Sequence, residues 1–397
     1  MLKLISRISL LTVLMLCAAW AQAKDSAPES RGILAGGFVL HPGAELGLAY
    51  DGRGSQGNDD GFVDIGVFFK TRLENEDLRS WNNEVSLKWR QYWGVGDADP
   101  NGGLEARVST SADLFKKSLF RLAPSASYQF LNDPEDDNLR VDFENHTVNA
   151  GVNFFIQPGE GAVFSQQIGY HLSGRFYTER SEVSNLTHRI ESVTRWSFLP
   201  QSSMALTLGT DITQYLEETR EGTGVPGASG DNANAYPFRI KYSLQGLLLE
   251  RLSYGLGLGY TYVYYDNKNT EHMFIMNARL AYSFQKDVNL SLEYKKDFNN
   301  VVYGDYYKLH QVSLRFDALW FEHLQTKAEV GFGAFDYRTL EAASRNDYLL
   351  TARADIYYHF FPGLKLGLEY RLRYNTSDAD DADYVKNLVS LNLSYTY

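Results

Sequence analysis

Basic side chains recur at alternate positions along many segments of the chain, as in Lys70 with Arg72 and Lys88 with Arg90. Ammonium and guanidinium groups bind carboxylates, phosphates and hydroxyl-rich molecules through charge-assisted hydrogen bonds. Residues two apart point to the same face of an extended strand, so this spacing gathers cations on one face. The basic residues that the pattern predicts to share a polar, pore-lining face are Lys70, Arg72, Lys88, Arg90, Arg107, Arg175, Arg189, Arg195, Arg239, Lys241, Arg279, Lys295, Arg315, Arg353, Arg371 and Arg373.

Acidic residues are mixed into the same face. They are Glu84, Glu105, Glu191, Asp211, Glu293, Asp317, Asp355 and Glu369. Two interpretations are open for each charged residue: a cross-strand ion pair, which is the commoner outcome for any single residue, or contact with a solute. Because basic residues outnumber acidic ones on this face, we expect it to favour anionic or hydroxyl-rich solutes over cations.

Catalytic motifs are missing from the sequence. Beyond residue 100 the histidines are His146, His171, His188, His272, His310, His323 and His359. None of them stands in H-E-x-x-H spacing, and no G-x-S-x-G segment occurs. The acidic cluster from Asp378 to Asp383 lacks the spacing of an EF-hand loop. It therefore indicates a solvated charged loop rather than a cation site. We therefore predict a protein that is not an enzyme and has no metal or cofactor, although a triad assembled from distant strands is compatible with the sequence.

The N-terminal residues have the features of a secretory signal peptide. A short basic segment precedes an apolar stretch, Ile8 to Ala19, and a small-x-small cleavage site, Ala21-Gln22-Ala23. We expect residues 1–23 to be removed and residues 24–42 to form a periplasmic segment or a partial plug. The alternatives are an uncleaved anchor helix, for which the apolar stretch is short, and a lipoprotein modified at Cys17.

The composition excludes several classes of protein. The only cysteine lies in the expected signal peptide, so disulfide and thiol chemistry are excluded from the rest of the chain. Beyond that segment there is no run of 18 apolar residues, which a transmembrane helix would need. The net charge of -11 argues against a nucleic-acid partner.

The C-terminal residues alternate strictly between apolar and polar side chains. Leu391, Leu393, Tyr395 and Tyr397 face one way, and the serine, asparagine and threonine residues between them face the other. Strict period two predicts a strand with one apolar and one polar face. A terminal strand that ends on an aromatic residue resembles the assembly signal of outer-membrane barrels, which implies that the barrel-assembly machinery is a partner.

The same alternation recurs throughout the chain and predicts about eighteen strands. Their ranges are roughly 43–50, 62–73, 84–93, 104–113, 119–131, 143–156, 163–177, 186–198, 203–216, 236–248, 253–265, 272–284, 288–297, 307–320, 324–336, 347–360, 364–374 and 385–397. Segments of about ten alternating residues separated by turns are typical of transmembrane barrels. We predict an all-β fold, one transmembrane antiparallel β-barrel over residues 43–397.

The connections between these segments alternate in length. Those after even strands are short, apart from a longer one around Asn75 to Asn83, and those after odd strands are longer and acidic. Bacterial barrels have short periplasmic turns and long outer loops, so both termini should be periplasmic. Aromatic residues gather near both ends of the strands, as two lipid–water interfaces favour. These features predict a location in the bacterial outer membrane, in contact with its lipid and lipopolysaccharide.

The layout resembles the β-barrel porin 2 family of outer-membrane proteins. The likeness rests on Gly37-Phe38-Val39-Leu40-His41-Pro42-Gly43 before the first strand, Tyr50-Asp51-Gly52 at its outer end, eighteen strands, and Tyr397 at the terminus. It covers the chain from about residue 32 onward. The resemblance implies a barrel that releases secreted polysaccharide beside a periplasmic polysaccharide export protein.

Three functions are therefore open at this stage. The leading hypothesis is a porin-like conduit for hydrophilic material that exports a polysaccharide. The first alternative is passive uptake of small, anionic or neutral solutes through the same kind of lumen. The second is a non-conducting adhesin or structural barrel that acts through its acidic loops. Eighteen strands are in the size range that usually leaves an aqueous channel, which favours the first two.

Overall fold

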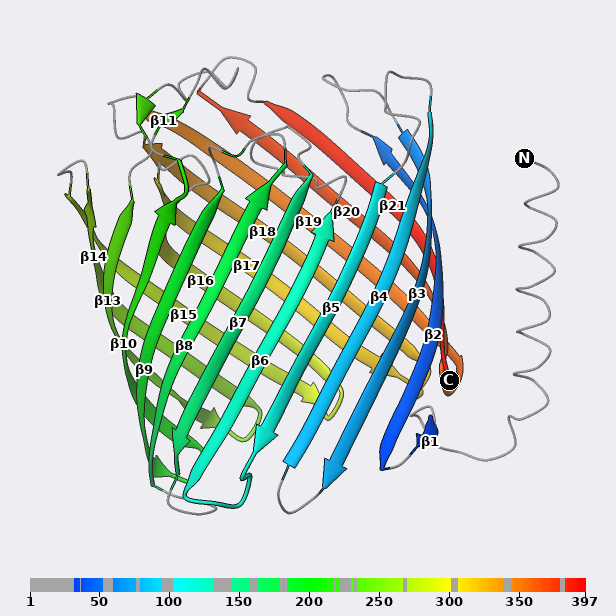
Figure 1. Cartoon of the computed structure of the whole chain (residues 1–397), viewed down its shortest axis with the longest axis horizontal. Coiled ribbons are helices and arrows are strands. Elements are labelled where there is room, and N and C mark those ends of the chain that lie inside the picture. The colour runs from blue at the N-terminus through cyan, green and yellow to red at the C-terminus, as the bar shows by residue number, and fades with distance from the viewer. Residues whose placement is uncertain are drawn as a thin grey trace.

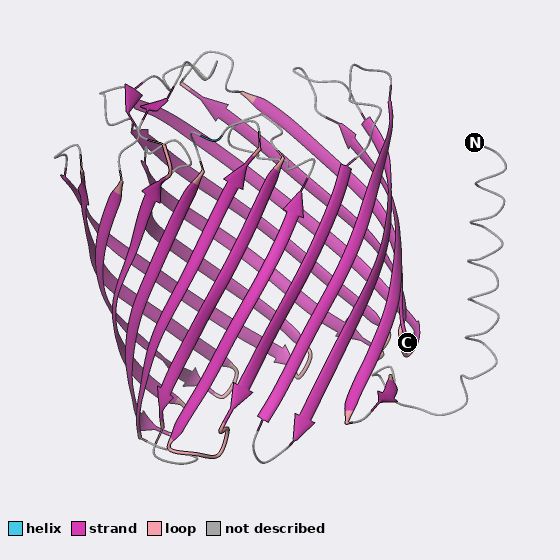
Figure 2. Cartoon of the chain, in the orientation of Figure 1, coloured by secondary structure: helices cyan, strands magenta, loops and turns pink. Residues whose placement is uncertain are grey.

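The chain forms strands over nearly all of its described length in a computed structural model (Figure 2). The described residues are 32–35, 37–52, 60–75, 79–94, 103–131, 144–157, 163–178, 181, 184–217, 219–220, 230–231, 234–266, 270–300, 306–338, 344–378 and 383–397. Among them no helix is long and apolar enough to cross a membrane. The expected signal peptide, residues 1–23, lies outside the described residues.

Eighteen long strands form the wall of the molecule. They are β2 (Phe38–Gly52), β3 (Asp60–Asn75), β4 (Arg79–Gly94), β5 (Gly103–Leu114), β6 (Phe120–Leu131), β7 (Asn145–Ile156), β8 (Phe164–Tyr177), β9 (Asn185–Leu199), β10 (Ser202–Tyr215), β13 (Ala235–Leu249), β14 (Leu252–Tyr265), β15 (Thr270–Gln285), β16 (Val288–Asn300), β17 (Tyr306–Trp320), β18 (Leu324–Arg338), β19 (Ser344–Phe361), β20 (Leu364–Ser377) and β21 (Tyr384–Thr396). Three short strands accompany them: β1 (Ile33–Ala35), β11 (Thr219–Arg220) and β12 (Gly230–Asp231).

The strands close into an antiparallel barrel (Figure 1). Each long strand pairs with the next one along the chain, and β2 also pairs with β21, from Gly43↔Thr396 to Gly52↔Asn387. Closure satisfies the backbone donors and acceptors of both edge strands, which a bilayer could not do. The predicted fold class is confirmed.

The two ends of the barrel differ as the connection lengths predict. The chain ends at the short-turn end, where the backbone N–H of Tyr397 donates to the carbonyl of Pro42 at 2.9 Å (Figure 1). The predicted exception is wrong: β3 continues to Asn75 and β4 begins at Arg79, so this turn is short too. Its flanking residues do not alternate in polarity, and only their backbone pairing reveals the longer strands.

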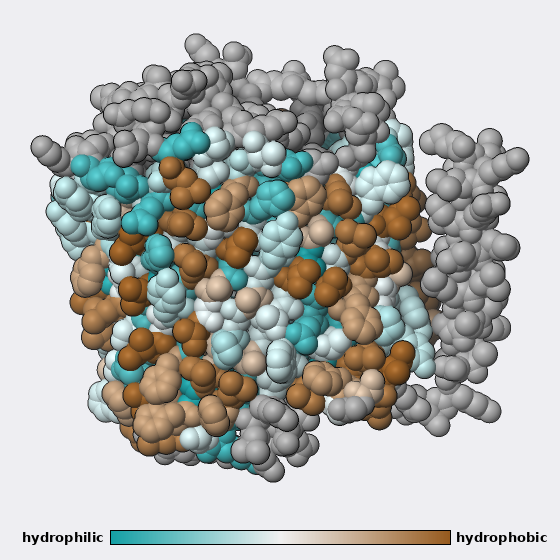
Figure 3. Space-filling view, in the orientation of Figure 1, coloured by the Kyte–Doolittle hydropathy of each residue, from teal (hydrophilic) through white to brown (hydrophobic). Residues whose placement is uncertain are grey.

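The apolar residues of each strand face away from the barrel interior. On β4, for example, Val85, Leu87 and Trp89 are each 48% exposed, and Lys88 and Arg90 occupy the opposite face. Apolar residues spread over the outer wall, whereas hydrophilic ones gather near its upper rim (Figure 3). Large exposed apolar side chains are costly in water but favourable in lipid. The outer wall is therefore a lipid-facing surface.

The first strand begins earlier than predicted. β2 starts at Phe38, five residues before the expected boundary at residue 43, and its register with β3 includes His41↔Lys70 and Pro42↔Phe69. Residues 38–40 are consecutively apolar and a proline follows, so period two is not visible there. Residues 38–42 therefore belong to the barrel wall, and β1 pairs with β2 through Ile33↔Leu40 to Ala35↔Phe38.

Candidate functional site

All of the basic residues predicted to line the pore occupy strand faces opposite the exposed apolar side chains. On β13, Arg239 and Lys241 alternate with Phe238, Ile240 and Tyr242, which are 54%, 41% and 45% exposed. The strand period alone accounts for this separation. The basic set lies on the lumen side of the wall.

Most of these basic residues have an acidic partner. The pairs are Lys70 with Glu84 (3.7 Å), Lys88 and Arg90 with Asp64 (2.8 Å each), Arg189 and Arg239 with Asp211, Lys295 with Asp297 (3.0 Å), Arg315 with Glu329 (3.0 Å), Arg353 with Asp355 (2.8 Å) and Arg371 with Glu369 (3.0 Å). Six of these nine cations form the expected cross-strand pairs, whereas Lys295, Arg353 and Arg371 pair with an acid two residues away on their own strand. All nine contribute little free charge to the lumen.

Asp64 on β3 joins two cations of β4. Its Oδ2 lies 2.8 Å from the ammonium of Lys88, and both carboxylate oxygens accept hydrogen bonds from Arg90, at 2.8 and 3.1 Å. The Arg90 guanidinium also lies 4.0 Å above the ring centre of Phe62, which is 5% exposed. A bidentate pair with a cation–π contact fixes this part of the wall. The pattern of charges did not indicate the role of Phe62.

Asp211 on β10 joins the strands on either side of it. It accepts hydrogen bonds from Nε of Arg189 on β9 and from Nη1 of Arg239 on β13, the latter at 2.7 Å. Nη2 of Arg239 donates to the backbone carbonyl of Phe298 on β16 at 3.2 Å. This last contact passes over the inner faces of β14 and β15, so it crosses the lumen side of the wall.

Other lumen cations have no acidic partner among the described residues. They are Arg107, Arg175, Arg195, Lys241 and Arg279. Some lumen acids likewise have no basic partner within the described part of the chain. They are Glu45, Glu191, Glu293 and Asp317. The lumen therefore has a mixed charge that leans toward basic.

A recess of about 240 Å³ lies in the inner wall. It is lined from five strands by Arg189, Glu191, Asp211, Arg239, Lys241, Asn277, Lys295 and Asp297, among others. Cε of Lys241 lies 2.6 Å from the point where a Cβ on Gly257 would be. Gly257 therefore gives the Lys241 side chain room to lie flat against β14. The Oδ1 atom of Asn277 is buried there without a hydrogen-bond partner in the described structure.

The barrel wall is split near its loop-rich end, between β15 and β16. Pairing between these strands stops at Met276↔Lys296, yet β15 continues along β14 to Thr270 and β16 continues along β17 to Asn300. We call this split the seam. The outer ends of β13–β15 and of β16–β17 are therefore separate layers at the seam.

The outer end of β16–β17 lies on the lumen side of β13–β15. The inward-facing Val263 and Tyr265 of β14 are fully buried, and Phe298, which would face lipid by its position in β16, is 1% exposed against them. The Phe298 and Tyr306 rings stack at 5.0 Å. This apolar cluster also includes Ala235 and Met273. The barrel is therefore narrowed from one side at this level.

Sequence reasoning missed this narrowing. A signal was nonetheless present: Lys295, Lys296 and Asp297 are three consecutive charges, and Lys308 also falls in register on the lipid side. Charges facing lipid cost a few kcal/mol near the midplane. Such positions indicate a strand that leaves the wall.

No group of three or more His, Cys, Asp or Glu side chains that could hold a metal ion occurs in the part of the chain that the structure describes. The predicted assembly residues lie on β21 and just beyond it. Leu391 and Leu393 pair with Leu48 and Leu46 of β2, and Tyr397 is 42% exposed. Their place at the closing strand is compatible with an assembly signal, which stays a prediction.

Comparison with known proteins yields similar folds at low sequence identity. No family model matches the chain, and no curated protein does either, so the resemblance to the β-barrel porin 2 family gains no support. Three similar solved structures are a BenF-like porin from Pseudomonas fluorescens Pf-5 and two Pseudomonas aeruginosa proteins, OccK7 (OpdD) and OpdL. Their TM-scores are 0.53, 0.52 and 0.51, with identities of 10%, 11% and 12%.

The alignments extend over nearly the whole length of each chain. The alignments cover 90%, 91% and 90% of this chain and 99% of each of the other chains, in the same order. At these identities the likeness concerns the fold, and no polysaccharide exporter is among the named structures. A closed barrel of eighteen strands with an apolar outer wall is a protein of the bacterial outer membrane, as its sequence predicted.

Proposed function

We propose that this protein is a passive uptake channel for small hydrophilic solutes, anionic or neutral. The observation that carries the proposal is the recess at Lys241, where a cation with no acidic partner among the described residues lies beside the ion pairs of Asp211 and Asp297. A side chain with no protein partner among the described residues is available to a solute. A carboxylate or a sugar hydroxyl can accept a hydrogen bond from its ammonium group.

The narrowing at the seam supports small solutes over polymers. The end of β16–β17 occupies part of the cross-section that a plain barrel of this size would leave open. A polysaccharide chain in transit needs a wide path along its whole length, whereas a small solute needs only a local opening. Similarity in fold to a BenF-like porin supports the same choice. No specific observation favours export or adhesion.

The proposal can be tested with the refolded barrel in two assays. Planar bilayers under a salt gradient give the single-channel conductance and the ion preference. Swelling of liposomes gives the relative permeability to glucose, gluconate and a long linear oligosaccharide. We expect a steady conductance with weak anion preference, and swelling with glucose and gluconate that is much faster than with the oligosaccharide.

Other outcomes would contradict it. Oligosaccharide permeation as fast as that of glucose would favour polysaccharide export. No conductance from protein shown to be folded by its gel mobility would favour the adhesin alternative.

A further inference from the structure

Tyrosine–histidine pairs recur on the lipid-facing surface. The Tyr128 hydroxyl of β6 lies 2.8 Å from Nδ1 of His146 on β7. The same contact joins Tyr170 with His188 at 2.9 Å and Tyr294 with His310 at 3.0 Å. Tyr128 and Tyr170 are 38% and 41% exposed on the apolar side of the wall.

The three pairs have one geometry. Each tyrosine lies on a strand that runs toward the loop-rich end. Each histidine lies on the next strand, two residues before the tyrosine's direct partner in sequence and therefore nearer the loop-rich end. The direct partners are Val148, Ile190 and Val312. Two further hairpins repeat the offset, with Tyr260 beside His272 at 6.0 Å between ring centres and Tyr370 donating to Oδ1 of Asn387 at 3.0 Å.

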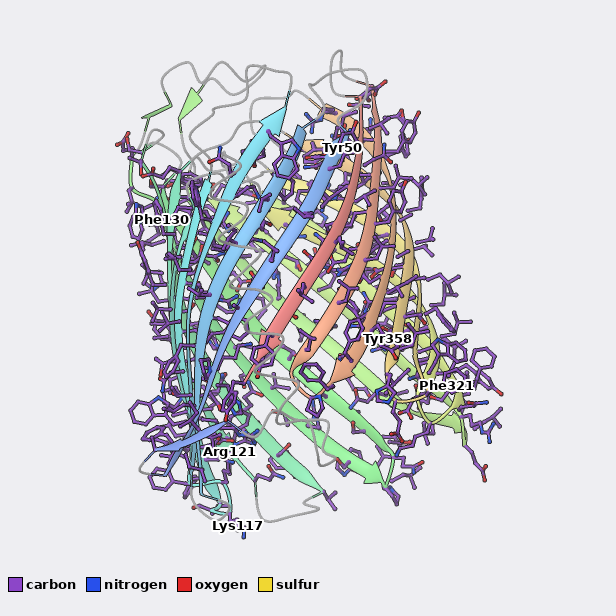
Figure 4. The ribbon with its side chains drawn as sticks, turned by 90° about the vertical axis from the view of Figure 1, so that its right-hand side faces the viewer. Tyr50, Lys117, Arg121, Phe130, Phe321 and Tyr358 are labelled. Carbon is purple, nitrogen blue, oxygen red and sulfur yellow. The ribbon has the colours of Figure 1, made fainter. Side chains whose placement is uncertain are left out.

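The pairs lie at one level of the barrel. The five tyrosines stand six to eight residues past the first residue of their strands, which are Phe120, Phe164, Leu252, Val288 and Leu364. With the histidine two residues further and a usual strand tilt, this level is roughly 20–25 Å above the short-turn end. The apolar band of such barrels is about 25 Å tall, so the pairs lie at its outer boundary. Figure 4 shows Phe130, which contacts His146, toward the loop-rich end.

The pairing leaves a ring N–H donor on the lipid-facing surface. When the tyrosine O–H donates to Nδ1, the ring proton lies on Nε2. Within the described structure, Nε2 of His188 and His310 has no protein partner, and that of His146 lies 4.0 Å from Glu144. A ring N–H in this position can donate to an oxygen of an anionic headgroup.

We propose that these pairs form a belt that binds the phosphate groups of outer-leaflet lipid headgroups, lipid A in particular. The tyrosine hydroxyl sets the histidine tautomer and orientation, and Nε2–H donates to a phosphate oxygen. The belt fixes the depth of the barrel in the outer leaflet. This role concerns the outside of the wall and is independent of what passes through the lumen.

The test uses the refolded full barrel in detergent and measures lipid binding by native mass spectrometry. The belt variant combines His146→Phe, His188→Phe and His310→Phe, and the control variant combines His171→Phe and His359→Phe, two histidines on the lumen side. We expect the belt variant to bind lipid A about tenfold more weakly than the unaltered barrel, because three modest hydrogen bonds are lost. The control variant should bind as the unaltered barrel does.

The source of the phosphate is tested in the same experiment. Dephosphorylated lipid A should bind the unaltered barrel as weakly as phosphorylated lipid A binds the belt variant, and inorganic phosphate should not compete. Equal binding of the two lipids, equal binding by the belt and unaltered barrels, or competition by inorganic phosphate would overturn the proposal. Gel mobility without boiling reports folding, and if the triple variant fails to fold, the three single variants are titrated separately.

Discussion

Lys308 of β17 and Glu271 of β15 form an ion pair across the seam, with Nζ 3.4 Å from Oε2. The two strands are not hydrogen-bonded to each other, and β16 stands between them in the sheet order. The contact therefore joins the two layers at the seam, the outer end of β16–β17 and the outer end of β13–β15. Together with the Phe298 cluster it holds the inner layer against the wall.

Phe298→Ala should loosen that inner layer. Removing a buried phenylalanine ring usually costs about 3–5 kcal/mol, and here the loss falls on the contact between the end of β16–β17 and the wall. We expect a larger and noisier single-channel conductance. The control is Phe332→Ala, since Phe332 is 51% exposed on the lipid side of β18 and should leave the conductance unchanged. Identical traces for the two variants would show that the inner layer does not limit the conducting path.

Lys241→Glu should change the ion preference of the channel. The substitution replaces an unpaired cation in the recess with an anion, so the reversal potential under a salt gradient should move toward cation selectivity. Lys241→Gln should move it about half as far. Lys286→Gln is the control, because Lys286 is exposed in the short turn between β15 and β16, away from the recess. If the potential stays constant in both Lys241 variants, the recess lies outside the ion path.

Asp64→Asn should lower stability and raise the preference for anions. Asp64 is 8% exposed and neutralises both Lys88 and Arg90, and breaking such a pair leaves two partly buried cations uncompensated. We expect a loss of about 2–3 kcal/mol in the free energy of unfolding, measured in urea with lipid vesicles. Asp317→Asn, which removes a lumen carboxylate that has no ion pair among the described residues, should cost much less. Equal losses would mean that the Asp64 cluster contributes no more than an exposed charge.

The turn between β17 and β18 should be stabilised by glycine. Phe321 and Glu322 have φ angles of 52° and 64°, which side chains with a Cβ rarely adopt. Phe321 is also 89% exposed and projects from the barrel (Figure 4), so little packing offsets the strain. Glu322→Gly should raise stability by about 0.5–1 kcal/mol. Lys286→Gly, in a turn with no positive φ, should lower it, and a gain there would contradict the explanation.

The carboxyl of Asp378 should titrate below its ordinary range. It lies just beyond β20 and accepts hydrogen bonds from the backbone N–H and the side-chain amide of Asn346, both at 2.8 Å, and the backbone bond is the main cause of its lowered pKa. A lowered pKa means that the contact stabilises the protein above the ordinary value and is lost as pH falls through the lowered one.

Carbon-detected NMR of labelled aspartate in nanodiscs can follow this titration. Asn346→Ala removes the side-chain donor and should raise the pKa of Asp378 part of the way back, since the backbone donor remains. An unchanged titration in Asn346→Ala would mean that the side-chain amide contributes nothing.

The strands and their two faces could be predicted from the sequence. Period two is a local property, and it places Lys241 and Tyr242 on opposite sides whatever the rest of the chain does. The partners of each charge could not be predicted in this way. Asp211 binds Arg239 because β10 pairs with β13 in one register, and a slip of one residue would separate them.

The prediction of polysaccharide export also depended on a property that the sequence pattern does not give. It rested on a resemblance in layout, and layout does not report how wide the lumen is. Width depends on where neighbouring strands stop pairing and on which side chains pack across the gap. Neither property is local to one segment.

The sequence by itself determined that this chain is a membrane barrel, which side chains share a face of each strand, and which end has short turns, because alternation and turn spacing are set by backbone geometry within each strand. The tertiary structure decided the seam, the recess at Lys241 and the level of the tyrosine–histidine pairs. These features depend on closure and on contacts such as Arg239 with the Phe298 carbonyl, between strands far apart in the sequence. These contacts contribute to stability only when the whole sheet has one register.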